Sequence, residues 1–149
     1  MSETLNRVKL SQWDALLLES LRGLGWSDEE LLLRVTVGDL PVDESEYHFD
    51  YKQLTALQAE KPGEFLQAVH EGYQIKYNTI RGIRSWISIA LGKVAVLELE
   101  EGKEAAEAAL TVDEKKRLET VLSFGWQILG GAQIATGATE VYRIEPIQR

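Results

Sequence analysis

The chain of 149 residues contains no cysteine, which excludes disulfide bonds, thiolate metal sites and a cysteine nucleophile. It has only two histidines, His48 and His70, so few side chains could act as a general base near neutral pH. A chain of this length can bury roughly 70% of the surface that its unfolded form exposes, so its core needs no disulfide or metal. We therefore expect a single domain over residues 1–149, with no cofactor.

Long hydrophobic runs are also missing. The longest one, from Trp86 to Leu97, is interrupted by serine, glycine and lysine and is shorter than the ~20 residues needed to span a bilayer. The first residues, MSETLNRVKLSQW, hold no apolar stretch of the kind found in secretory signals. The absence of cysteine fits a reducing compartment. We expect a cytoplasmic protein with no membrane partner.

Positive charge is scarce, because 16 lysines and arginines face 24 aspartates and glutamates and the formal net charge is −8. An acidic chain repels nucleic acid and anionic lipid on average. A local basic patch could still bind an anion, since salt screens the field of distant charges beyond about 8 Å. Nucleic acid is therefore a disfavoured partner, while a small basic patch stays a candidate anion-binding site.

Helix starts are the clearest local signals. In residues 11–22 apolar side chains recur at helical spacing, with Ser11 as the N-cap and glycines at the end. Capping boxes are expected in which Ser27 pairs with Glu30 and Thr111 pairs with Glu114. Residues 50–60 have the pattern of a further helix. The helix after Thr111 is expected to run to the glycines at 130–131.

Residues 63–91 predict one long helix. Pro62 suits its first turn, where the missing amide donor costs nothing, and Gly92 suits the position after its end. On a helical wheel the apolar residues leave only about 140° of polar arc, so most sides of the helix should be covered. The apolar stripe consists of Leu66, Val69, Tyr73, Ile80, Ile83, Ile87 and Leu91.

The expected fold is a mainly α, compact helical bundle around the central helix 63–91. An α+β alternative stays open, because short strands are conceivable at residues 34–37, 94–99 and 140–144. Residues 93–100 could be either a strand or the beginning of a helix. The segment 132–149 is expected to be an extended C-terminal tail or an edge strand.

The polar arc of the central helix is basic although the chain is acidic. The stretch KYNTIRGIRSWISIALG, residues 76–92, holds no aspartate or glutamate. Arginine suits binding of carboxylate or phosphate, because its planar guanidinium can donate two parallel hydrogen bonds. The candidate partner-binding residues are Tyr77, Asn78, Arg81, Arg84 and Ser88.

Three interpretations of this arc are open. In the favoured one, Arg81 and Arg84 pair with carboxylates of the acidic run that follows. In the second, the arc faces outward and binds an anionic or acidic ligand. In the third, two copies of the chain associate through it. The acidic run offers Glu98, Glu100, Glu101, Glu104 and Glu107.

Other motifs do not predict a catalytic or metal site. Glu46, His48 and Asp50 would project on one side of an extended segment, but a solvated acidic loop is the better interpretation. The sequence HEGYQ after Val69 lacks the second histidine of a zinc-protease helix, and GGAQIATG lacks the lysine of a phosphate loop.

The resulting hypothesis is a non-catalytic protein-binding or assembly module of a bacterial or phage type. Its partner would be an acidic or anionic protein, or a second copy in a homo-oligomer. One alternative is a nucleic-acid-associated accessory protein that uses the same arginines. A second alternative is a small hydrolase with a carboxylate acid/base pair.

Overall fold

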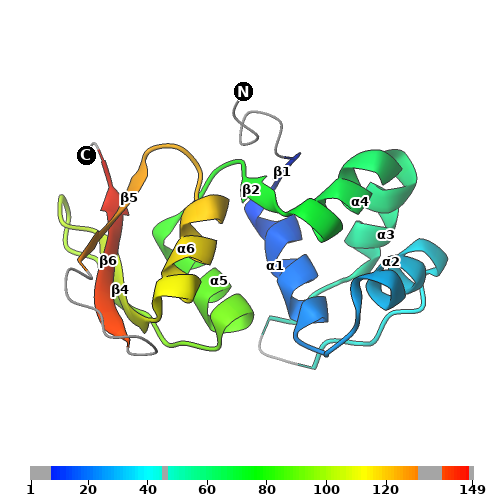
Figure 1. Ribbon diagram of the computed structural model, residues 1–149, viewed down its shortest axis with the longest axis horizontal. Helices are drawn as coiled ribbons and strands as arrows, with labels where there is room; N and C mark the ends of the chain where they lie inside the picture. The colour runs from blue at the N-terminus through cyan, green and yellow to red at the C-terminus, as the bar shows by residue number, and fades with distance from the viewer. Residues whose placement is uncertain (1–7, 45–46, 131–138, 148–149) are drawn as a thin grey trace. The chain divides into compact units, whose positions relative to one another are not determined.

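The structure is a computed structural model that describes residues 8–44, 47–130 and 139–147. The chain divides into two compact units, Met1–Gln74 and Ile75–Arg149, which are described separately (Figure 1). The expectation of one domain stays a prediction. Within the described ranges, no helix is both long enough and apolar enough to cross a membrane.

Unit 1 is mainly helical. The strand β1 forms a two-stranded sheet with β2, whose last residue is the first of unit 2. Four helices lie between these strands in the sequence, and α3 contacts both α2 and α4. The elements are β1 (Val8–Leu10), α1 (Gln12–Arg22), α2 (Asp28–Val37), α3 (Lys52–Glu60), α4 (Pro62–Glu71) and β2 (Tyr73–Ile75).

The core of unit 1 is built on α1. Residues Ala15 to Glu19 are all buried, so this helix is covered on more than one side. The other helices add apolar side chains at helical spacing, such as Leu31 and Val35 one turn apart on α2. Each large apolar side chain that is fully buried contributes roughly 1.5–3 kcal/mol to stability.

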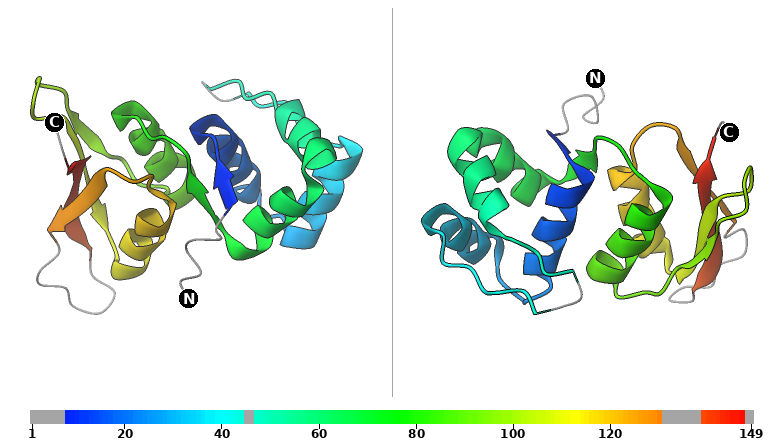
Figure 2. Two further views of the ribbon diagram at one scale, coloured as in Figure 1. Left: turned by 90° about the horizontal axis from the view of Figure 1, so that it is seen from above. Right: turned by 180° about the vertical axis from the view of Figure 1, so that it is seen from behind.

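Unit 2 is a two-layer α+β structure. Its antiparallel sheet has the strand order β3-β4-β6-β5, and the helices α5 and α6 lie on one face of that sheet (Figures 1 and 2). The elements are α5 (Ile80–Trp86), the π-helix η2 (Ile87–Leu91), β3 (Val96–Glu98), β4 (Ala105–Leu110), α6 (Val112–Val121), β5 (Trp126–Gly130) and β6 (Glu140–Pro146).

The register of the sheet aligns apolar residues across all four strands. Leu97 of β3 lies opposite Ala106 of β4, Ala106 lies opposite Ile144 of β6, and Ile144 lies opposite Ile128 of β5. Ala106 and Ile144 are fully buried. Because side chains alternate along a strand, the adjacent row projects to the other face, where Arg143 lies opposite Glu107.

The expected long helix over residues 63–91 is wrong. The chain forms α4, then the strand β2, and only then α5. Gly72 ends α4 with φ of 94° and ψ of 176°. Residues other than glycine rarely adopt this backbone conformation. Thr79 then starts α5, because its side chain accepts a hydrogen bond from the Gly82 amide at 3.1 Å.

The all-α bundle is also wrong, because the fold is α+β. The strands β3 and β6 fall in two of the three segments that were considered for strands, whereas residues 34–37 belong to the end of α2. Residues 126–130, assigned to a helix from the sequence, are the strand β5, and residues 105–110, which belonged to the open alternative of a helix beginning in 93–100, are the strand β4. The segment 132–149 contains β6, which pairs on both sides and is therefore an inner strand; residues 131–138 and 148–149 lie outside the described part.

Predictions about helix starts are mostly confirmed. Ser11 caps α1 by accepting a hydrogen bond from the Asp14 amide at 3.0 Å. Thr111 and Glu114 form the complete capping box at the start of α6. At α2 only half of the expected box forms: Ser27 accepts from the Glu30 amide, while the Glu30 carboxylate accepts from Arg34 at 2.9 Å.

Candidate partner-binding surface

The helix α5 and its continuation η2 carry the basic residues that the sequence singled out. Arg81, Arg84 and Ser88 are spaced three and four residues apart, so they share one side of the helix. All three are exposed, and so is Tyr77, which precedes the helix and has 77% of its surface accessible. We call Tyr77, Arg81, Arg84 and Ser88 the basic face.

The arginines of the basic face are not neutralised by carboxylates of the described chain. Among residues 8–44, 47–130 and 139–147, neither Arg81 nor Arg84 makes an ion pair or a hydrogen bond through its side chain. The favoured expectation was pairing with the acidic run after residue 97. Glu107 of that run instead pairs with Arg143 at 3.1 Å.

Two more members of the acidic run are occupied locally. The Glu98 carboxylate accepts a hydrogen bond from the Glu100 amide at 3.0 Å. The Glu100 carboxylate lies 3.5 Å from the Lys103 ammonium. Three of the five glutamates of the acidic run therefore have partners other than α5, and Arg81 and Arg84 are exposed.

Asn78 does not belong to the exposed surface. It has 4% of its surface accessible, and its backbone amide donates a hydrogen bond to the Ser123 hydroxyl at 3.1 Å. In return, the Ser123 amide donates to the Asn78 side-chain oxygen at 2.7 Å. This reciprocal pair joins the segment before α5 to the segment after α6, so the role of Asn78 in the fold is structural.

The opposite side of α5 packs inside unit 2. Trp86 is almost fully buried, and the Arg117 guanidinium of α6 lies 5.2 Å from the centre of its ring. The same guanidinium donates a hydrogen bond to the Ala90 carbonyl at 3.4 Å. Arg117 thus has a structural role between the two helices, unlike the exposed arginines of the basic face.

The negative charge of the chain is unevenly distributed. Residues 1–74 hold 14 acidic residues and 6 lysines or arginines, whereas residues 75–149 hold 10 of each. The whole formal net charge of −8 therefore lies in the first segment. The basic face belongs to a unit with no net formal charge, so repulsion of an anion by its own unit is weaker than the total suggests.

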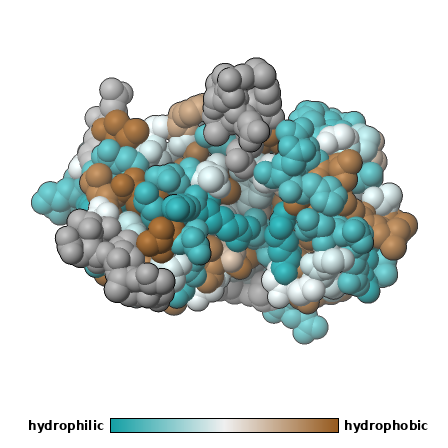
Figure 3. Space-filling model, in the orientation of Figure 1, coloured by the Kyte–Doolittle hydropathy of each residue, from teal (hydrophilic) through white to brown (hydrophobic). Residues whose placement is uncertain are grey.

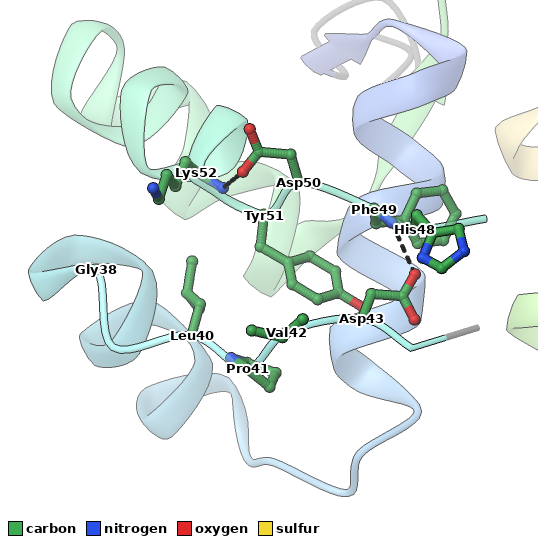
Figure 4. Close-up of a pocket in the computed structure, with 10 residues that line it drawn as sticks. All are labelled: Gly38, Leu40, Pro41, Val42, Asp43, His48, Phe49, Asp50, Tyr51 and Lys52. Carbon is green, nitrogen blue, oxygen red and sulfur yellow. Dashed lines mark hydrogen bonds between the residues drawn. The ribbon is translucent and has the colours of Figure 1, made fainter. Parts of the chain in front are cut away.

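A pocket of about 370 Å³ lies in unit 1, between the end of α2 and the start of α3 (Figure 4). Tyr51 is buried against it, and the Tyr51 and Ser20 hydroxyls lie 2.6 Å apart. Burial raises the pKa of Tyr51 above its usual value, the Ser20 hydrogen bond lowers it, and the negative charge of Asp43 raises it further. The pocket lining also includes His48.

The acids of this pocket do not form a catalytic pair. The Asp43 carboxylate accepts a hydrogen bond from the Phe49 amide at 2.8 Å, and the Asp50 carboxylate accepts one from the Lys52 amide at 3.1 Å. Figure 4 shows the two carboxylates pointing in different directions. Both stabilise the local backbone, which gives no support to the hydrolase alternative.

The metal-binding alternative in this segment receives no support either. Glu46 lies outside the described residues. His48 has φ of 48°, so the chain is not extended there and the expected same-side projection does not apply. Among the residues that the structure describes, no three potential ligands gather around a common point.

One exposed residue was missed in the sequence. Phe124, directly after Ser123, has 82% of its surface accessible. Apart from the grey atoms, Figure 3 shows hydrophobic residues in small separate patches on the face in view, so surface hydropathy alone does not mark a binding site. The available signal was an aromatic residue between serine and glycine at a turn.

The fold and this surface define the protein as an α+β protein with an exposed basic helix face whose two arginines have no carboxylate partner among the described residues. Comparisons with protein families, curated proteins and solved structures find no match to the chain. The function must therefore be inferred from the chemistry of the surface itself.

Proposed function

We propose that the protein is a non-catalytic binding module whose basic face recognises an acidic segment of a partner protein. The observation that supports this proposal is the exposure of Arg81 and Arg84 without a carboxylate partner in the described chain. Two guanidinium groups one helical turn apart can each bind one carboxylate in bidentate fashion.

Carboxylates suit the basic face better than a nucleic-acid backbone does. Binding a nucleic acid tightly requires several phosphate contacts along the strand, each of which adds to the salt dependence. The basic face offers two arginines, and the rest of unit 2 has 10 acidic and 8 basic residues. Two arginines match a short acidic segment, which needs only two charges in register.

The test measures the binding of a fluorescein-labelled peptide of ten glutamates by fluorescence anisotropy, with a serine-glycine peptide of the same length as reference. We expect the wild-type chain to bind the acidic peptide only. The double substitution Arg81→Glu and Arg84→Glu should weaken binding by about tenfold or more, which corresponds to ~1.4 kcal/mol. The substitutions Arg81→Lys and Arg84→Lys should weaken it less, because they keep the charge and lose the bidentate geometry.

The matched control is the double substitution Lys103→Glu and Lys116→Glu. It changes the net charge of unit 2 by the same amount at two exposed positions outside the basic face. Equal loss of binding in both double variants would contradict the proposal, because only the total charge would matter. Absence of binding by wild type would contradict it as well.

The same variants distinguish the basic face from an internal ion pair. Replacing exposed arginines that have no ion pair in the described part of the chain should change the free energy of unfolding by no more than about 0.5 kcal/mol. A larger loss of stability in urea for Arg81→Glu and Arg84→Glu would mean that the guanidinium groups serve the fold.

Self-association is a separate outcome of these measurements. Sedimentation velocity of the unlabelled chain would reveal a homodimer, and the double arginine variant would be monomeric if the acidic segment came from a second copy. A monomeric wild type that binds the glutamate peptide would assign the basic face to a different protein.

A further inference from the structure

Unit 2 has two exposed aromatic residues, Tyr77 of the basic face and Phe124 after α6. Tyr77 and Phe124 have 77% and 82% of their surface accessible, so neither contributes much to the core. Aromatic residues are enriched among the side chains that carry most of the energy in protein interfaces. Most of each side chain is therefore in contact with solvent and accessible to a partner.

The reciprocal hydrogen bonds of Asn78 and Ser123 link the two segments that carry these aromatics. Tyr77 directly precedes Asn78, and Phe124 directly follows Ser123. The two bonds measure 3.1 and 2.7 Å and both are buried. Since consecutive Cα atoms are about 3.8 Å apart, each aromatic is held one residue from a fixed point of the fold.

The helix that follows places positive charge beside the aromatics. Arg81 comes four residues after Tyr77, and Thr79 between them caps α5 and orders the connection. Along the chain, an exposed aromatic residue thus precedes the two exposed arginines of the basic face. A partner that fits it needs both an apolar side chain and carboxylates.

We propose that Tyr77 and Phe124 form an apolar contact site and that the partner is an acidic peptide segment carrying an aromatic or large aliphatic side chain beside its carboxylates. This inference rests on the proposed function, because the carboxylates bind the arginines of the basic face. Charge complementarity sets the acidic character of the partner. The exposed aromatics set the requirement for an apolar residue, since their rings lose contact with water when they pack against such a side chain.

Single-stranded nucleic acid is the competing class, because bases also stack on aromatic side chains beside arginines. It would need a positively charged groove that follows the backbone beyond the first two phosphates. The sequence after Ser88 continues with one lysine and then the acidic run from Glu98 to Glu107. The observations therefore favour the acidic peptide, and an oligonucleotide is included in the test.

The experiment compares two labelled peptides with the same number of glutamates, one with a central tryptophan-leucine pair and one with two serines instead. We expect wild type to bind the tryptophan-leucine peptide about five- to tenfold more tightly, in the range of a single interface anchor. Phe124→Ala should remove most of that difference and change binding of the serine peptide by less than about twofold. Val141→Ala is the control, because it truncates another exposed apolar residue of unit 2, on β6.

The possible outcomes separate this inference from the proposed function. If neither peptide binds, the proposed function and this inference both fail. If the two peptides bind equally and Phe124→Ala has no effect, the acidic partner stands and the apolar contact site is overturned. If an oligonucleotide of ten thymidines binds more tightly than either peptide and Phe124→Ala weakens it, the partner is single-stranded nucleic acid and the peptide assignment is overturned.

Discussion

The phenol of Tyr73 donates a hydrogen bond of 2.6 Å to the carboxylate of Glu19 inside unit 1. Both residues have 2% of their surface accessible, and 54 positions separate them in the sequence. The bond joins α1 to β2, which directly follows the glycine that ends α4. A buried carboxylate is costly to place in a core unless hydrogen bonds satisfy it, so this contact should matter to stability.

Tyr73→Phe should lower the free energy of unfolding by about 1.5–3 kcal/mol, the range for a hydrogen bond to a charged group. The ring still fills its site, so the loss reports the hydroxyl alone. Urea denaturation of Tyr73→Phe, Glu19→Gln and the double variant measures the coupling between the two side chains. A coupling energy near zero would show that the Glu19 carboxylate does not depend on the phenol.

The hydrogen bonds between Asn78 and Ser123 should also contribute to stability, in unit 2. Asn78→Ala leaves the buried Ser123 amide without its acceptor, and Ser123→Ala does the same to the Asn78 amide. Each substitution should cost about 1–3 kcal/mol in the free energy of unfolding. Because both break one reciprocal unit, the double variant should cost less than the sum of the two. Additive losses in urea denaturation would contradict the reciprocal arrangement.

Gly72→Ala should destabilise the protein by about 1–3 kcal/mol, because alanine must adopt a backbone conformation that is essentially restricted to glycine. Gly63 provides the matched control. It lies in the first turn of α4, and an added methyl group would meet nothing within 4 Å. Gly63→Ala should be neutral or stabilise by up to about 1 kcal/mol. Equal effects of the two substitutions on the urea midpoint would mean that the backbone at position 72 is not held at positive φ.

The stability of unit 1 should fall at high pH because the pKa of Tyr51 is raised above the ordinary tyrosine value of 10.0, mainly by burial. In the unfolded chain the phenol loses its proton near pH 10, whereas in the folded chain it keeps the proton to higher pH. The unfolded state therefore binds fewer protons in that window, and the free energy of unfolding decreases as pH rises through it. Below pH 10 this contribution is fully present.

Tyr51→Phe removes the titrating group and should flatten the decline of stability above pH 10 relative to wild type. The variant also loses the hydrogen bond to Ser20, so Ser20→Ala serves as the control for that contact. Denaturation midpoints measured on both sides of pH 10 test the prediction. The same steepness in wild type and Tyr51→Phe would contradict it.

Local features of the fold could be predicted from the sequence, and the pairing of distant segments could not. Ser11 and Thr111 start their helices as expected, because an N-cap needs only the backbone amide two or three residues away. The segment AAEAAL at Ala105–Leu110 is rich in alanine, the best helix former, and is nevertheless the strand β4. It pairs with β3 on one side and with β6 on the other, and this tertiary pairing overrides the local preference.

The binding surface shows the same division. Arginines at positions 81 and 84 and the absence of acids around them are visible in the sequence. Whether a distant glutamate neutralises them, and whether Asn78 joins them on the surface, depends on which segments lie next to α5. The segment of Phe124 is linked to the segment of Tyr77 by the hydrogen bonds between Asn78 and Ser123, which the sequence does not reveal.

By itself, the sequence determined that no disulfide forms, where most helices begin, and that one short basic segment interrupts an acidic chain. The tertiary structure decided that the predicted central helix is broken at Gly72, that alanine-rich residues form a strand, and that Arg81 and Arg84 face solvent. The reason is the range of the interactions. Caps and turns act over three or four residues, whereas burial, strand pairing and charge neutralisation depend on residues that only the folded chain brings together.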